Sequence, residues 1–323
     1  MNVMNFSGAL GETIQKVSKP FEKDHNVHIN WGYGTGTENA AKVAAAKTNQ
    51  TYDVSFNDMQ SQNLASTKGL WSKLDPKVVN VGDIFEATRA PNNDGVPIGT
   101  IEDMITYDTK VFEAKGWSPP TAMSDILDPK FCNQVGILDV GASYGLYVVL
   151  GLGGLTAQQA TAGDLEKPFD LGLNRLKEHK SCFPSIESSA GALGQKITSG
   201  QYTIAITGSV RALPIIMSGA PVKAVVPKEG AFLTISYASP VKGAPNPKLA
   251  QELVAFFATS SVQQKLMEET FYGPTNKNVK VPEELQKLGV LGGKSVSKFI
   301  VPAVSKVAES RTAWTDKYQR AVG

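Results

Sequence analysis

Four short turns between apolar segments carry the residues whose chemistry is easiest to interpret. At each turn, a run typical of a β-strand breaks at small residues and leads directly into a segment with helical spacing. The turns are Ser7-Gly8, Gly34-Thr35-Gly36-Thr37, Gly141-Ala142-Ser143 and Thr207-Gly208-Ser209. The first N–H groups of a helix have no partners within it, and the helix dipole places positive charge there, so such turns favour anions. In open α/β sheets, ligands bind beyond the carboxyl ends of the strands, where these turns should gather.

One of the turns is followed by a cation, Arg211. A guanidinium holds a carboxylate or phosphonate through two parallel charge-assisted hydrogen bonds, a geometry that lysine cannot reproduce. We therefore predict that Arg211 clamps a small anion, the alternative being a surface arginine or a structural salt bridge. The residues predicted to donate hydrogen bonds beside it are Ser7, Gly8, Thr35, Thr37, Ser143, Tyr144 and Ser209. Simple helix capping is the alternative role for their hydroxyl groups.

Acidic and aromatic residues near the same turns could complete a site for a zwitterion. Asp58 and Asp139 each end a predicted strand, and Asp58 is the better candidate for binding an amino group. Glu102-Asp103 is another possible ammonium partner, although a charged hinge face would explain it equally well. Tyr237 is a candidate for a ligand-binding wall that excludes water, whereas aromatic residues at the ends of elements often belong to the core.

A catalytic alternative comes from the segment 141–145, which matches G-x-S-x-G between a strand and a helix. That is the context of a hydrolase nucleophile, here Ser143. The mechanism needs a histidine base later in the chain, and only His179 follows, with little room for the intervening strands and acid. We therefore predict no catalytic residue and keep a serine hydrolase as the less favoured alternative. The histidines are scattered, so we also predict no metal site and no cofactor.

The bulk composition restricts the class of protein. A chain of 323 residues is long enough to suggest two domains. Hydrophobic residues make up 41% and charged residues 19%, as in globular proteins. The net charge of +2 argues against a nucleic-acid surface. No apolar run approaches the roughly 20 residues that a membrane-spanning helix needs.

The two cysteines, Cys132 and Cys182, flank turn-like stretches and belong to no C-x-x-C pair. That spacing offers no zinc site. They form either a disulfide in an exported protein or two buried thiols in a cytosolic one, and we favour the disulfide. Because Met1 directly precedes the first predicted strand, an exported protein of this kind would have had its signal peptide removed.

The order of elements predicts two lobes. Strand and helix segments alternate in β-α-β order, which implies mostly parallel sheets with right-handed crossovers. We expect lobe 1 to comprise residues 1–104 and 236–323, and an inserted lobe 2 to comprise 105–235. The hinge is expected near 101–107 and 232–238, because connections made of two extended strands can bend without unfolding either lobe.

Several motifs, taken in order, resemble those of a known family. They are Tyr52-Asp53-Val54-Ser55-Phe56-Asn57-Asp58, Gly69-Leu70-Trp71-Ser72-Lys73-Leu74-Asp75, Val226-Pro227-Lys228-Glu229-Gly230-Ala231, Ser239-Pro240-Val241-Lys242-Gly243-Ala244-Pro245-Asn246-Pro247 and Tyr272-Gly273-Pro274-Thr275-Asn276. Over nearly the whole chain, they resemble the type II periplasmic solute-binding proteins of ABC importers (extracellular solute-binding family 1), especially the polyamine- and iron-type branch. The resemblance implies a two-lobed α/β fold, each lobe a mixed, mostly parallel sheet flanked by helices. It also implies a solute held between closing lobes, export to the periplasm and delivery to an inner-membrane ABC permease.

Departures from that branch narrow the solute. Polyamine receptors hold ammonium groups with acidic residues at the cleft turns, but the corresponding turns here lack carboxylates and gain Arg211. Iron receptors use adjacent tyrosines, and this chain has no Tyr-Tyr pair. We therefore expect a monomeric, non-enzymatic receptor for a small anionic or zwitterionic solute, such as γ-aminobutyrate, a carboxylate or a phosphonate. A polyamine receptor with relocated acidic residues is the alternative within the family.

Overall fold

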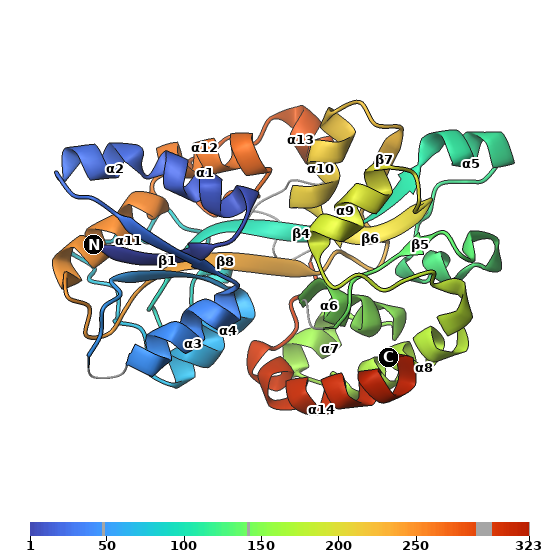
Figure 1. Ribbon diagram of the computed structural model, residues 1–323, viewed down its shortest axis with the longest axis horizontal. Helices are drawn as coiled ribbons and strands as arrows, with labels where there is room; N and C mark the ends of the chain where they lie inside the picture. The colour runs from blue at the N-terminus through green and yellow to red at the C-terminus, as the bar shows by residue number, and fades with distance from the viewer. Residues whose placement is uncertain (47–48, 141–142, 289–298, 323) are drawn as a thin grey trace. The chain divides into compact units, whose positions relative to one another are not determined.

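The computed structural model describes residues 1–46, 49–140, 143–288 and 299–322, and these form two compact units (Figure 1). Unit 1 comprises Met1–Thr100 and Thr234–Glu283, and unit 2 comprises Ile101–Leu233 together with 284–288 and 299–322. The first boundary lies within the strand β4 (Val96–Asp108), earlier than the expected residue 104, and the second lies at the start of β8 (Leu233–Pro240). Within the described ranges, no helix combines the length and apolar character needed to cross a membrane.

Unit 1 is an α/β sandwich around a mostly parallel sheet. Its strands and helices are β1 (Asn2–Phe6), α1 (Ala9–Val17), α2 (Lys19–Asp24), β2 (Asn30–Gly34), α3 (Gly36–Ala46), β3 (Val54–Asp58), α4 (Met59–Thr67), a 3-10 turn (Glu86–Thr88), α11 (Pro247–Ala258) and α12 (Ser260–Thr270). The strand order is β2-β1-β3-β8, with β1 parallel to both neighbours and β8 antiparallel to β3. Helices α1, α2, α11 and α12 cover one face of the sheet, and α3 and α4 cover the other (Figure 1). Both faces of β1 and β3 are therefore buried, so that polar Asn5, Ser55 and Asn57 are buried beside apolar Val3, Val54 and Phe56.

Unit 2 is built on the second half of β4. Its other elements are α5 (Thr109–Lys115), 3-10 turns (Met123–Leu127, Pro129–Phe131 and Lys180–Cys182), β5 (Val135–Gly136), α6 (Ser143–Leu152), α7 (Ala157–Ala162), α8 (Glu166–Glu178), α9 (Ala190–Thr198), β6 (Ile204–Gly208), α10 (Ser209–Met217), β7 (Val222–Val225) and α14 (Val304–Val322). A short helix, α13 (Glu283–Lys287), begins at Glu283 of unit 1 and continues into unit 2. Strand β4 lies antiparallel to β6 and β7, while β5 is parallel to β6. The mixed α/β class expected from the sequence is confirmed.

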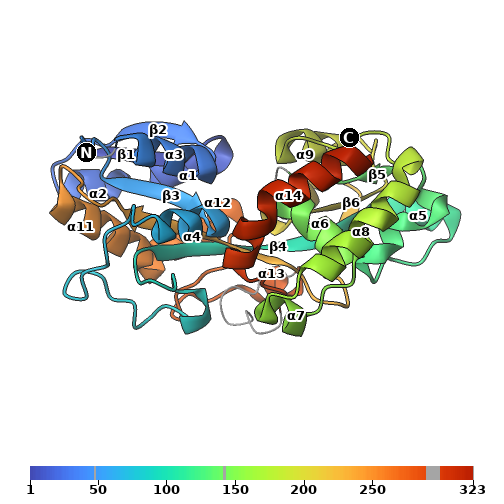
Figure 2. The same cartoon turned by 90° about the horizontal axis from the view of Figure 1, so that it is seen from below.

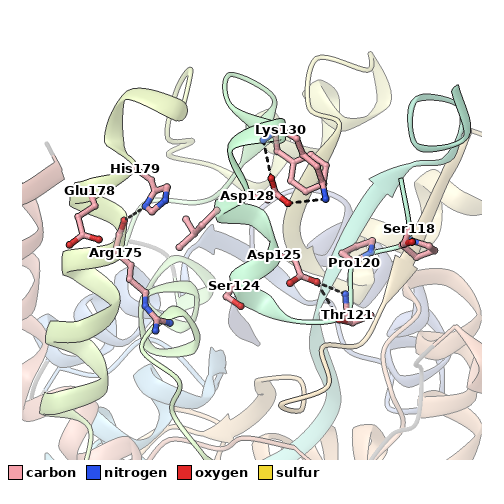
Figure 3. A pocket seen from close by; sticks show the side chains of 13 residues that line it. Ser118, Pro120, Thr121, Ser124, Asp125, Asp128, Lys130, Arg175, Glu178 and His179 are labelled. Carbon is pink, nitrogen blue, oxygen red and sulfur yellow. Dashed lines mark hydrogen bonds and ion pairs between the residues drawn. The ribbon is translucent and has the colours of Figure 1, made fainter. Parts of the chain in front are cut away.

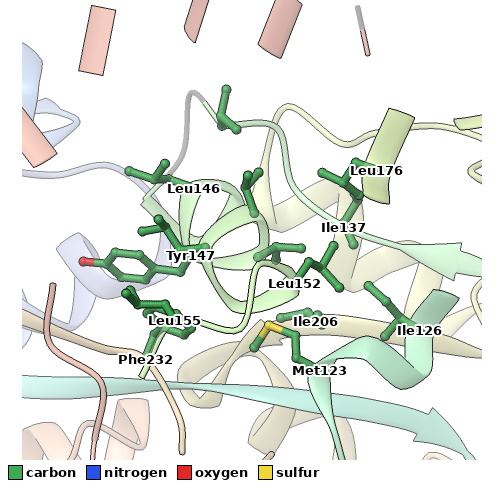
Figure 4. Packing of buried hydrophobic residues seen from close by; sticks show 14 of the residues in the cluster. Met123, Ile126, Ile137, Leu146, Tyr147, Leu152, Leu155, Leu176, Ile206 and Phe232 are labelled. Atoms are coloured by element: carbon green, nitrogen blue, oxygen red, sulfur yellow. The ribbon is translucent and has the colours of Figure 1, made fainter. Parts of the chain in front are cut away.

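The core of unit 2 surrounds α6 (Figure 4). This helix is apolar on nearly all sides: the consecutive residues Leu146, Tyr147, Val148, Val149 and Leu150 are each almost completely buried. The Tyr147 ring stacks on Phe232, with the ring centroids 5.0 Å apart. A helix buried all round needs no polar face, which explains why its sequence lacks amphipathic spacing.

The C-terminal helix α14 belongs to unit 2, and the assignment of all of 236–323 to the first lobe is wrong for this segment. The Trp314 ring stacks on Phe169 of α8 with a centroid distance of 4.5 Å, and its Nε1 donates to Glu166 Oε2 at 2.8 Å. Figure 2 shows α14 lying alongside α8. Stacked aromatic rings bury a large apolar area, so packing rather than position along the chain decides where this helix docks.

The two cysteines form a disulfide, as predicted. Cys132 follows one 3-10 turn and Cys182 ends another, and the backbone N–H of Asn133 donates to the Cys182 carbonyl at 2.8 Å. The bridge therefore fastens two loops of unit 2 that are distant in sequence.

Candidate functional site

Three helix starts of unit 1 gather at the carboxyl edge of the parallel strands. Helices α1, α3 and α4 follow β1, β2 and β3 directly, so their N-termini lie at one edge of the sheet. The Ser7 N–H donates to the Gly34 carbonyl at 3.2 Å. A Cβ atom added to Gly36 would lie 2.4 Å from Asp58 Oδ2, so only glycine allows these two turns to approach so closely. Ser7, Thr37 and Asp58 therefore lie at one edge of the sheet, as the sequence predicted, because the turns that carry them are in direct contact.

Most of the polar groups at this edge already have partners. Thr35 and Glu38 form a reciprocal cap, in which the Thr35 N–H donates to the Glu38 carboxylate at 2.7 Å and the Glu38 N–H donates to Thr35 Oγ1 at 3.2 Å. The hydrogen bonds from Thr35 lower the pKa of Glu38. The exposed Thr37 hydroxyl pairs with Ser61 Oγ at 3.2 Å. The Thr35 hydroxyl therefore serves helix capping, the alternative role noted from the sequence, whereas the Thr37 hydroxyl links α3 to Ser61 of α4.

Asp58 is the N-cap of α4. Its Oδ1 accepts the backbone N–H groups of Gln60 and Ser61, both at 3.0 Å, and its Oδ2 accepts the Ser61 hydroxyl at 2.9 Å. Both carboxylate oxygens are therefore engaged in holding the helix start. The structure gives Asp58 a capping role that needs no amino group.

The start of α1 differs from the other two. Gly8 is its N-cap at φ 77°, a left-handed conformation that glycine adopts readily, and no side chain caps the helix there. The first N–H groups of α1 are consequently not held by a capping side chain, and Ser7 beside them is exposed.

Tyr237 lies in the core of unit 1. The side chain is 2% exposed and its hydroxyl donates to the Thr88 carbonyl at 3.0 Å. Burial, with a smaller contribution from Asp94, raises the pKa of Tyr237 far above its ordinary value. The structure thus places Tyr237 in the core role that was the alternative to a ligand wall.

In unit 2, the start of α10 is held by a buried acid. Ser209 and Glu102 are both 0% exposed. The Ser209 hydroxyl donates to Glu102 Oε2 at 2.9 Å, and its Oγ accepts the Glu102 backbone N–H at 3.3 Å. Ser209 therefore links the first turn of α10 to β4, and its side chain is already paired.

The start of α6 faces the same strand ends. A Cβ atom on Gly208 would lie 3.3 Å from Tyr144 Cε1 and 2.8 Å from Ile101 Cγ2, so the absence of a side chain lets Tyr144 approach β6. Helix α6 begins at Ser143. The turn residues Gly141 and Ala142, and the Ser143 side chain, lie outside the described part of the chain.

Arg211 is partly buried against α9 and retains hydrogen-bonding capacity. Its side chain crosses Gly194, where an added Cβ atom would lie 2.8 Å from Arg211 Cδ. Among the residues that the structure describes, its buried Nε has no hydrogen-bond partner. The buried Thr207 hydroxyl in the preceding turn likewise has no partner within the described ranges.

Asp103 is the residue whose environment the sequence could not predict. Its side chain is 0% exposed, and neither carboxylate oxygen has a hydrogen-bond partner among the described residues. Desolvation, and secondarily the neighbouring Glu102, raises the pKa of Asp103 well above its usual value. A charged hinge face is therefore excluded for Glu102-Asp103, since both side chains are buried. The acidic pair between Ile101 and Met104 was the only sequence signal for this site.

A groove lies elsewhere in unit 2, near the disulfide (Figure 3). It encloses about 700 Å³ and is lined by Asp125, Asp128, Arg175, His179 and neighbouring residues, none of which was predicted to bind solute. Its polar groups are largely paired internally: Asp128 forms an ion pair with Lys130 at 2.9 Å, and Asp125 accepts the Thr121 N–H at 2.7 Å. We therefore do not assign the groove to the solute.

His179, the base required by the hydrolase alternative, lines this groove at the end of α8. Its Nδ1 lies 2.9 Å from the Arg175 carbonyl oxygen, which makes this nitrogen a donor. In the described part of the chain, no group of three or more His, Cys, Asp or Glu residues could hold a metal ion.

Comparison with known proteins identifies the family. Residues 16–291 match the model of the bacterial extracellular solute-binding proteins. The chain is 26% identical over 288 residues to a γ-aminobutyric acid-binding protein of Pseudomonas aeruginosa, covering 86% of this chain and 77% of that one.

Solved structures share the fold at lower identity. A periplasmic binding protein, MotA from A. tumefaciens B6 in complex with glucopine, superposes with a TM-score of 0.82 at 18% identity, over 100% of this chain and 99% of that one. An ABC transporter protein from Clostridium perfringens gives a TM-score of 0.79 at 20% identity, with 100% of each chain covered. The GABA receptor Atu4243 gives 0.82 at 18% identity, over 99% and 97% of the two chains. The chain therefore belongs to the family of bacterial extracellular solute-binding proteins.

Proposed function

We propose that this receptor captures a small solute carrying a carboxylate or a similar anion, and that Arg211 is its principal anchor. The observation that carries the proposal is the state of Arg211: it follows a strand-to-helix turn, and its buried Nε has no partner among the described residues. A buried donor without a partner costs free energy that an anionic ligand would recover. A guanidinium can also form two parallel bonds to one carboxylate.

The helix starts of unit 2 support the same assignment. The N-termini of α6 and α10 add partial positive charge near the end of β6, where Tyr144 approaches Gly208. We assign Ser209 to holding the α10 start in place and propose Ser143 and Tyr144 as ligand donors. In unit 1 we keep Ser7, Gly8 and Thr37 as proposed donors and assign Thr35 and Asp58 to capping.

The class of solute is proposed from the relatives. One matching protein is named for binding γ-aminobutyric acid, and one structural neighbour is named as a GABA receptor. These names support a short ω-amino acid or a comparable carboxylate rather than a polyamine. We further propose that the protein acts as a monomer, transforms nothing, and delivers the solute to an inner-membrane ABC permease.

Isothermal titration calorimetry tests the proposal with γ-aminobutyrate, aminoethylphosphonate, citrate and spermidine. The Arg211→Ala variant should lose about 10- to 100-fold in affinity for whichever anion binds, because a charge-assisted contact is worth roughly 1.5–3 kcal/mol. Arg211→Lys should recover only part of that affinity, since lysine lacks the paired donors. Arg320→Ala, which changes an exposed arginine in α14, is the matched control and should bind normally. Preferential binding of spermidine, or an unchanged Arg211→Ala variant, would refute the assignment.

A further inference from the structure

Two aspartates of this protein share full burial but differ in their partners. Asp53 and Asp103 are both 0% exposed. The Asp53 carboxylate accepts the backbone N–H groups of Asn2 and Asn246, each at 2.8 Å, and also contacts the Asn246 amide. Neither oxygen of Asp103 has a partner among the described residues. Asp53 is thus explained by the fold, whereas Asp103 is not.

Asp103 lies in β4 beside the turn that begins α10. In the antiparallel β4–β6 pair it is directly opposite Gly208, the last residue before α10. Residues directly opposite each other in such a pair point to the same face of the sheet. The face of Asp103 is therefore the one from which Tyr144, at the start of α6, approaches Gly208.

A cationic partner would stabilise the ionised carboxyl group of Asp103. An unpaired carboxylate without solvent is costly, and Glu102, adjacent in sequence and also buried, adds repulsion. No metal ion is indicated, because the described residues contain no group of three or more His, Cys, Asp or Glu that could hold one. A single ammonium group supplies three donors and a positive charge, which would satisfy both Asp103 oxygens at once.

We propose that Asp103 recognises the amino group of the solute, so that the solute is a zwitterion whose anionic end is held by Arg211. This inference rests on the proposed function and deepens it. It moves the amine contact from Asp58, whose two oxygens already accept three hydrogen bonds, to a carboxyl group that has none. Both charged ends of the solute are then recognised from unit 2, by residues of β4 and α10.

The test compares solutes that differ only in the amine. Wild-type protein is titrated calorimetrically with 3-aminopropanoate, 4-aminobutanoate and 5-aminopentanoate, each paired with the carboxylate of equal length that lacks the amine and with its ω-hydroxy analogue. We expect at least one amino acid to bind about tenfold or more tightly than both of its analogues. Asp103→Asn, which keeps the size of the side chain but removes its charge, should abolish that preference while still binding the carboxylates.

Asp53→Asn is the matched control, because it changes an equally buried aspartate that is engaged by the backbone. It should lower the melting temperature and preserve the preference for the amine. Retention of the preference in Asp103→Asn, or equal loss of affinity for amino and non-amino solutes, would overturn the inference. If the carboxylates bind wild type without regard to the amine, the inference fails while the proposed function stands. If no carboxylate binds and Arg211→Ala changes nothing, both fail.

Discussion

Several polar groups near the helix-start turns differ in hydrogen-bonding state between the two units. In unit 1, Thr35 is paired with Glu38, and Asp58 accepts three hydrogen bonds from the first turn of α4. In unit 2, the Thr207 hydroxyl, the Arg211 Nε and both oxygens of Asp103 have no partner within the described ranges. The first set of groups stabilises the fold on its own. The second set is buried at a cost that the fold does not recover.

This difference indicates where a ligand would matter. A buried polar group left unpaired costs roughly 1–3 kcal/mol, which a ligand that pairs with it would recover. In a solute-binding protein the solute is the natural compensation. The contrast therefore favours unit 2 as the source of the charged contacts, with unit 1 contributing mainly the open backbone N–H groups of α1.

The largest expected effect concerns the stability of unit 2, which is cross-linked, whereas unit 1 contains no cysteine. The Cys132→Ser/Cys182→Ser double variant should lose about 4 kcal/mol of unfolding free energy, because the bridge closes a loop with a sequence separation of 50. Urea unfolding followed by tryptophan fluorescence measures this loss. An unchanged midpoint in the double variant would show that the bridge contributes nothing to the stability of unit 2.

The second expected effect is a difference in stability between variants of the unpaired Asp103 and the paired Asp53. Asp103→Asn should raise the stability of the solute-free protein by about 1–3 kcal/mol at neutral pH, because it removes a carboxyl group that is costly to ionise when buried. Asp53→Asn, at a fully bonded site, should instead lower it.

The stability difference between wild type and Asp103→Asn should depend on pH. Folding raises the pKa of Asp103 above the value of 3.8 that it has when exposed, so its cost is absent below that pH. The cost then grows as the pH rises toward the folded pKa. Melting temperatures of wild type and Asp103→Asn should converge in acid and diverge toward neutral pH. A difference in melting temperature that stays constant with pH would contradict the expected cost of ionising Asp103 in the folded protein.

The smallest effect tests the paired side of the comparison. Asp58→Ala should reduce the stability of the protein by about 1 kcal/mol, as expected for loss of an N-cap, while solute affinity changes little. Thermal unfolding and calorimetric titration of the same variant measure the two quantities. A large loss of affinity with normal stability would return Asp58 to the role of amine ligand and weaken the contrast between the units.

Much of the fold could be predicted because its signals are local. Small residues after apolar runs predicted the helix starts after β1, β2 and β6, and the order of segments predicted the family. The disulfide was also predicted, since Cys132 and Cys182 both flank turns. The docking of α14 was not, because it depends on Trp314 meeting Phe169 of α8, and two isolated aromatic residues carry no sequence signal for each other.

The amino-acid sequence therefore determined which residues could bind a charged solute, because side-chain type and the small residues of the turns are local properties of each position. Only the tertiary structure decided which of those residues are already occupied. The partners of Asp53 lie as far away as Asn246, and the burial of Asp103 depends on packing of strands and helices that are distant in sequence. Hydrogen-bond satisfaction is a property of three-dimensional neighbours, and so it separates capping residues from candidate ligand residues where composition and spacing cannot.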